Sequence, residues 1–165
     1  MRAFAAATVV AVLIGCGGSQ KTSPDPDPAP GPSAKQRACS RYGIRMAPFL
    51  RRLDTALDQF ALRVEAAEDD TARADSAREL SSFIDEEIVG LENIDSTDAE
   101  LNRSHKLLVA SLAEVGLASE QIATAYVLAD RGVKLRALAR RNDGLGHWSE
   151  AHRDIVTQCS EDADR

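Results

Sequence analysis

Aromatic residues and cysteines are scarce in this sequence, and the common catalytic motifs are missing. Phe, Trp and Tyr make up 4% of 165 residues, and only three cysteines occur. The sequence has no HExxH zinc pattern, no CxxCH haem-attachment motif and no closely spaced CxxC redox pair. A glycine-rich phosphate loop is also absent. None of these catalytic motifs is present, so we expect that the protein is not an enzyme.

Proline is almost confined to one short segment. Five of the six prolines fall within residues 24–32, at alternate positions. Because proline fixes φ and removes a backbone donor, neither helix nor sheet can form there. We expect a disordered, extended linker over residues 16–36, reaching on the order of 50–60 Å. A proline-rich recognition ligand is less well supported, because no PxxP segment with flanking basic residues is present.

The N-terminal segment is uncharged after a short basic start. Arg2 precedes residues 3–14, which carry no charge. This run is too short for a permanent transmembrane helix and has the length of a signal-peptide core. It ends in the tetrad Leu13-Ile14-Gly15-Cys16.

This tetrad resembles the lipobox of bacterial lipoproteins. The resemblance implies cleavage of a signal peptide, residues 1–15, and attachment of diacylglycerol and a further acyl chain such as palmitate to Cys16. Gly17 stands where Asp would imply retention in the inner membrane, so the resemblance implies the outer membrane, facing the periplasm or the outside. An ordinary signal peptide with a chance cysteine is the alternative. The membrane is therefore an expected partner through the lipid.

The mature chain would be acidic. Without residues 1–15 it has 19 basic and 26 acidic side chains, a formal charge of −7. Nucleic acid and anionic lipid favour basic proteins, so this net charge argues against general binding to either.

Apolar residues from residue 37 onward repeat at helical spacing. The pattern predicts an all-α fold: an antiparallel up-and-down bundle of about four helices over residues 37–160, followed by a tail at 161–165. The first helix is expected from Ala47 or Pro48 to residue 68, with residues 38–46 as a possible extension. The second is expected over residues 71–92.

The third predicted helix is unusually long. A capping box at residues 97–100 marks its start, and the basic pair Arg140 and Arg141 before Gly144 indicates its end. We expect a kink at residues 116–119, since its neighbours are half as long. A last helix is predicted over residues 146–159.

Two cysteines remain after lipidation, Cys39 and Cys159, at opposite ends of the folded region. In an oxidising compartment such a pair is expected to form a disulfide. Two free buried thiols are the alternative.

The last predicted helix contains the least ordinary local segment, with His147, Glu150 and His152. We favour a helix whose Trp148 fills the bundle end, because residues five apart do not share a helical face. A metal site at these residues is the minor alternative. Met46 and His152 also occupy places comparable to the haem ligands of periplasmic four-helix cytochromes, a resemblance of only two residues.

Two functions follow from this sequence. The first is a membrane-anchored, non-enzymatic interaction or structural module of the cell envelope, with a protein partner and no cofactor. The alternative is a periplasmic bundle that binds haem or a divalent metal. The basic run between Arg131 and Arg141 is interpreted mainly as a solvated helix end, and less readily as a patch for an anionic partner such as lipopolysaccharide or an acidic protein.

Overall fold

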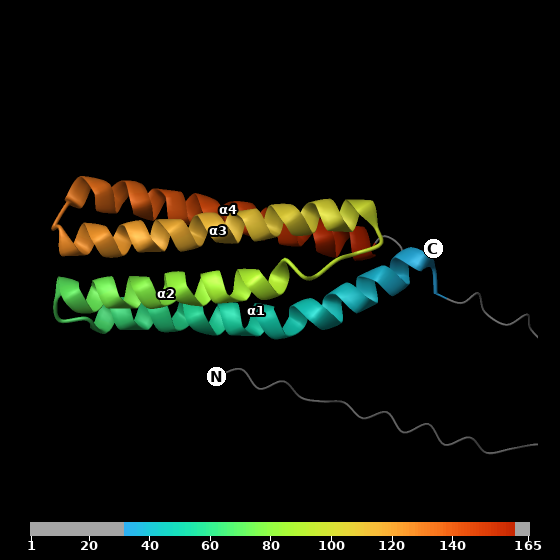
Figure 1. Ribbon diagram of the computed structural model, residues 1–165, viewed down its shortest axis with the longest axis horizontal. Helices are drawn as coiled ribbons and strands as arrows, with labels where there is room; N and C mark the ends of the chain where they lie inside the picture. The colour runs from blue at the N-terminus through green and yellow to red at the C-terminus, as the bar shows by residue number, and fades with distance from the viewer. Residues whose placement is uncertain (1–31, 161–165) are drawn as a thin grey trace, which may run out of the picture. The chain divides into compact units, whose positions relative to one another are not determined.

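The computed structural model describes residues 32–160, which form four α-helices and no strand. The helices are α1 (Ala34–Ala66), α2 (Asp70–Leu91), α3 (Ala99–Val127) and α4 (Arg131–Ser160). Successive helices run in opposite directions, and the α1–α2 and α3–α4 turns lie at the same end of the bundle (Figure 1). The predicted all-α bundle of four helices is confirmed.

Several predictions fall outside the described residues. These are the signal peptide (residues 1–15), the lipidated Cys16, the linker as far as residue 31, and the tail at 161–165.

α1 begins well before the predicted start. Ser33 caps it with a reciprocal pair of hydrogen bonds: its Oγ accepts from the Gln36 backbone N–H at 3.0 Å, and its own N–H donates to Gln36 Oε1 at 2.7 Å. This is a capping box, which the sequence analysis overlooked. Residues 34–36, assigned to the linker, are therefore helical. The predicted start at Ala47 or Pro48 was wrong, whereas the possible extension over residues 38–46 is helical as expected.

Pro48 lies inside α1 and does not end it. Its missing N–H and its ring disfavour a helix interior by about 3 kcal/mol. Burial on both sides of the proline outweighs this cost, since each large apolar side chain contributes roughly 1.5–3 kcal/mol. The buried residues of α1 are Ala38, Tyr42, Met46, Phe49 and Leu53. Figure 1 shows α1 bending between its two halves, as a proline in the helix explains.

α3 ends at Val127, whereas a helix over residues 97–141 with a kink at 116–119 was expected. Ala129 adopts a left-handed φ of 53°, and its N–H donates to the Tyr126 carbonyl at 3.1 Å. The Asp130 N–H donates to the Ala125 carbonyl at 3.0 Å. This is a Schellman motif, which usually carries glycine at the left-handed position. Alanine there removed the signal that would have marked the helix end.

α4 is correspondingly longer than the predicted helix over residues 146–159. The Asp130 carboxylate caps it by accepting from the Val133 N–H at 2.9 Å. Gly144, interpreted as a stop signal, is a buried position inside the helix. The start of α3 also differs by one residue from the prediction, because the Asp98 carboxylate, rather than the Thr97 hydroxyl, accepts from the first backbone N–H groups.

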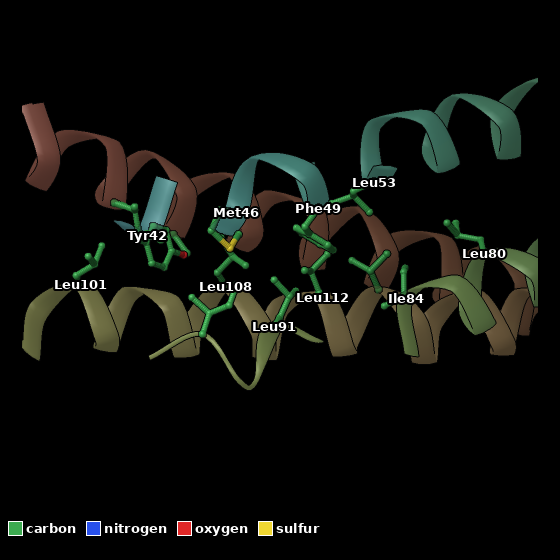
Figure 2. Packing of buried hydrophobic residues seen from close by; sticks show 14 residues of the cluster. Tyr42, Met46, Phe49, Leu53, Leu80, Ile84, Leu91, Leu101, Leu108 and Leu112 are labelled. Atoms are coloured by element: carbon green, nitrogen blue, oxygen red, sulfur yellow. The ribbon is translucent and has the colours of Figure 1, made fainter. Parts of the chain in front are cut away.

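α3 is the central helix and packs along both α2 and α4. Large side chains fill the core at the end near the disulfide, where Tyr42, Met46 and Phe49 point from α1 toward Leu108 and Leu112 of α3 (Figure 2). Small residues dominate the core near the two turns. This second cluster contains Ala74, Ala77, Ile122, Ala123 and Ala137. Small side chains allow α2, α3 and α4 to approach closely at that end.

Gly144 marks a close approach of α4 to α3. A Cβ atom there would lie 3.0 Å from Val115 Cγ2 and 3.3 Å from the Ser111 carbonyl oxygen. A buried valine in a helix has one preferred rotamer, and the carbonyl belongs to the backbone, so neither yields easily. Gly146, two residues later, has nothing within 4 Å of the same position.

We predict opposite effects for two matched substitutions. Gly146→Ala should raise the free energy of unfolding by about 0.5–1 kcal/mol, because alanine favours the helix and meets no neighbour. Gly144→Ala should lower it by about 1 kcal/mol, because overpacking separates α3 from α4. Urea denaturation of both variants measures the difference. Equal stabilisation by both would contradict the close approach.

Candidate functional site

A buried hydrogen-bond chain joins three helices. His105 of α3 is 4% exposed and Tyr42 of α1 is 6% exposed. The Tyr42 hydroxyl lies 2.9 Å from His105 Nδ1, and His105 Nε2 lies 2.9 Å from the Leu91 carbonyl at the end of α2. The two rings meet edge to face, with centroids 5.4 Å apart. These two hydrogen bonds therefore fix α1 and α2 to the same residue of α3, His105.

The geometry determines the tautomer of His105. A carbonyl oxygen only accepts, so Nε2 carries the proton and donates it to Leu91. Nδ1 is then the acceptor for the Tyr42 hydroxyl. Burial lowers the pKa of His105, opposed by the bond to Leu91, and burial raises the pKa of Tyr42. Both side chains are thus neutral and saturated with partners, an arrangement suited to structure rather than proton transfer.

Sequence reasoning missed the hydrogen bonds that join Tyr42, His105 and Leu91. The neighbouring Ser104 points elsewhere and accepts a hydrogen bond from Gln158 Nε2 at 3.0 Å. Tyr42 lies 63 residues before His105, and no local spacing indicates their contact. A histidine on the buried face of a helix was the one available signal.

Cys39 and Cys159 are joined in the structure. Their Sγ atoms lie 2.07 Å apart and their Cα atoms 5.6 Å apart, linking the first turns of α1 to the last turn of α4. The bridge spans 120 residues. In the chain-entropy model, closing a loop of this length stabilises the fold by about 4–5 kcal/mol.

The metal candidates of the last helix do not converge. His147 is 64% exposed at its side chain, and its Nδ1 lies 3.9 Å from Glu114 Oε2 of α3. His152 stacks on Trp148, with ring centroids 5.5 Å apart and planes 9° from parallel. Glu150 is exposed. Among residues 32–160, no group of three or more His, Cys, Asp or Glu side chains is arranged to hold a metal ion.

His147 and Glu150 do line a groove between α3 and α4, of about 330 Å³. The groove combines exposed apolar surface with acidic side chains and has no lysine or arginine in its lining. Its lining residues are Leu107, Ala110, Ser111, Glu114, His147, Glu150, Ala151 and Asp154. Leu107 is 56% exposed, so an apolar side chain stands at the rim among three carboxylates.

Of the two residues compared with haem ligands, Met46 lies inside the core. Met46 is 2% exposed and belongs to the large apolar cluster, among the side chains of Tyr42 and Phe49. His152 is half-buried and occupied by its stacking on Trp148. Haem coordination by this pair would require the apolar core to open.

The basic run in α4 is partly used for packing. Lys134 lies over the ring of Tyr126 at 4.8 Å, and Arg141 lies over the ring of Phe60 at 5.1 Å. Burial lowers the pKa of Arg141. The exposed members of the run are Arg131, Arg136 and Arg140.

By length and composition, α3 is the one helix within residues 32–160 that could cross a membrane. Half of its most apolar window, of mean hydropathy 1.2, is buried inside the bundle. The central helix of a bundle meets the same criteria, so this result does not distinguish a core helix from a membrane-spanning one.

No family model matches the chain, and no curated protein or solved structure is significantly similar to it.

The neutral, buried His105 predicts a specific pH dependence of stability. As the pH falls through about 6.5, the unfolded histidine gains a proton, whereas the folded one, whose pKa burial lowers, gains it only at lower pH. The unfolded state then binds more protons, so the free energy of unfolding falls. His105→Phe should remove this contribution, which urea denaturation at about pH 7.5 and about pH 5.5 measures.

The matched control is His147→Phe, since the His147 side chain is exposed. This variant should keep the acid sensitivity of the parent protein. If both variants lost stability with falling pH as steeply as the parent, His105 would not be the group responsible.

Proposed function

We propose that this chain is a bacterial envelope lipoprotein, held at the outer membrane by acyl chains on Cys16. The helical bundle acts as a non-enzymatic interaction or structural module. The observation that carries the proposal is the tetrad Leu13-Ile14-Gly15-Cys16 at the end of the uncharged run that begins at residue 3. Two or three acyl chains anchor a protein stably, because each buried CH₂ contributes about 0.8 kcal/mol.

Two further observations support a structural or binding role for the bundle. The disulfide between Cys39 and Cys159 suits a protein exposed to an oxidising compartment. The buried titratable groups Tyr42 and His105 are fully engaged in hydrogen bonds between helices. Their chemistry stabilises the bundle and presents no reactive group to solvent.

The groove between α3 and α4 is the surface we assign to a protein partner. Three carboxylates, Glu114, Glu150 and Asp154, surround exposed apolar surface there. A basic amphipathic helix complements this lining, because its apolar face would cover Leu107 while its cations meet the carboxylates.

The anchor is tested by a substitution at the proposed lipidation site. The parent protein, extracted from the membrane fraction, should begin at residue 16 and carry the mass of its acyl chains. Cys16→Ser should lose that mass, and the protein should leave the membrane fraction. Cys39→Ser is the control and should keep both lipid and location. Recovery of the parent protein without acyl mass, or with residues 1–15 attached, would refute the proposal.

The partner surface is tested with a photoreactive residue placed at position 107 in cells. We expect one adduct of defined mass, strongly reduced by the charge reversals Glu114→Lys and Glu150→Lys. The same residue at position 62, where Leu62 is 65% exposed on α1, provides the control for chance collisions. Equal adducts at both positions, or adducts that survive the charge reversals, would remove the groove from the proposal.

A further inference from the structure

The net negative charge of this chain conceals a strong separation of charge. Residues 34–52, the first part of α1, hold six basic residues and no acidic one, a formal charge of +6. Residues 53–160 hold 11 basic and 21 acidic residues, a formal charge of −10. The net charge of the whole chain therefore does not exclude binding of anionic lipid by this half of α1.

Of the six basic residues in this segment, five are exposed and Lys35 is half-buried, and four have no acidic partner within residues 32–160. Lys35 approaches Glu100 at 3.9 Å, and Arg52 pairs with Glu87 at 2.5 Å. The other four form no ion pair with a carboxylate within residues 32–160. They are Arg37, Arg41, Arg45 and Arg51. Their positive charges are thus available to an external anion.

Arginine and apolar residues share one exposed face of α1. Arg37, Arg41, Ile44, Pro48 and Arg51 follow each other at steps of four, three, four and three, which places them on a single stripe. Ile44 is 74% exposed, an unusual position for a large apolar side chain. Exposed apolar side chains among arginines are typical of a surface that lies on anionic lipid.

A shallow groove of about 340 Å³ adjoins this face, between α1 and the connection before α3. Arg41, Ile44 and Arg45 line it on the α1 side. Asp95 is the one carboxylate in its lining. Arg45 also donates to the Asn93 carbonyl at 2.6 Å, which holds its guanidinium at the edge of the groove.

We propose that this face of α1 binds the anionic phospholipid headgroups of the membrane that anchors the chain. The inference rests on the proposed lipid anchor. Seventeen residues separate Cys16 from Ala34, and this length of chain limits the start of α1 to about 50 Å from the lipid surface. Tethering raises the effective concentration of the surface, so a weak attraction between arginines and headgroups suffices. The acidic remainder of the bundle is repelled, which orients the basic face toward the membrane.

The test uses the chain from residue 16 onward with Cys16→Ser, which keeps the bundle and carries no acyl chain. Vesicles of equal parts phosphatidylglycerol and phosphatidylcholine should sediment with the protein at low salt. High salt, or vesicles of phosphatidylcholine alone, should abolish binding, because the attraction is electrostatic. Binding to neutral vesicles of equal strength, or none to the anionic ones, would overturn the inference.

Matched pairs of substitutions locate the surface. Arg41→Gln with Arg45→Gln should weaken binding to anionic vesicles by about 25-fold, at roughly fivefold for each charge. Arg136→Gln with Arg140→Gln removes two exposed arginines at the same spacing in α4 and should leave binding unchanged. Circular dichroism confirms that each variant keeps its helices. Equal weakening by both pairs would overturn the assignment to α1.

Two outcomes separate this inference from its rivals. Salt-sensitive self-association without vesicles, lost on Arg41→Gln with Arg45→Gln, would assign the face to a second copy of the chain and overturn the lipid assignment. An unacylated native protein whose bundle still binds anionic vesicles through α1 would refute the proposed anchor while leaving the basic face supported.

Discussion

The position of the first half of α1 depends on its attachment to α3 and α4. Proline interrupts the backbone hydrogen bonds of this helix at residue 48, so local helix preference does not by itself hold the two halves in line. The buried bond between Tyr42 and His105 fixes the segment to α3, and the disulfide fixes it to α4. Removing one member of a buried polar pair typically costs about 1–3 kcal/mol, because the other is left unsatisfied. Both the core at this end and the orientation of the arginine face follow from this attachment.

The same attachment separates two surfaces with opposite character. The exposed side of the first half of α1 is basic, whereas the groove between α3 and α4 is lined by carboxylates. With its cationic helix facing the membrane and its acidic groove elsewhere, the bundle would bind a protein partner in the groove while it contacts lipid through α1. Net charge hides this arrangement, because the acidic residues outnumber the basic ones over the chain as a whole.

Sequence periodicity predicted the helical class, the number of helices and much of the core, since leucines such as Leu53, Leu108 and Leu112 repeat at helical spacing and are buried. Helix boundaries were predicted less well. Ala129 ends α3 in a conformation that usually requires glycine, and Gly144 lies inside α4 because α3 approaches it. In both places tertiary packing decided the conformation against the usual residue preference.

A contact between distant residues could be predicted only for the two cysteines, because cysteines bond to each other. Cysteines have few alternatives in an oxidising compartment, so Cys39 and Cys159 were an obvious pair. Tyr42 and His105 have many possible partners, and nothing local to either selects the other. The cationic face of α1 was visible in the sequence, yet it required the knowledge that residues 34–47 are helical to align the arginines on one side.

The disulfide also determines how the bundle would respond to a mechanical pull. The bridge joins Cys39, near the start of α1, to Cys159, near the end of α4. Tension arriving from the N-terminal side enters the helices at residue 34 and meets the bridge within the first two turns. All of the chain between the two cysteines forms a closed covalent ring, so such tension passes across the bridge instead of peeling α1 from its neighbours. A protein stretched between its two ends would therefore keep its core intact while only the outermost residues bear the force.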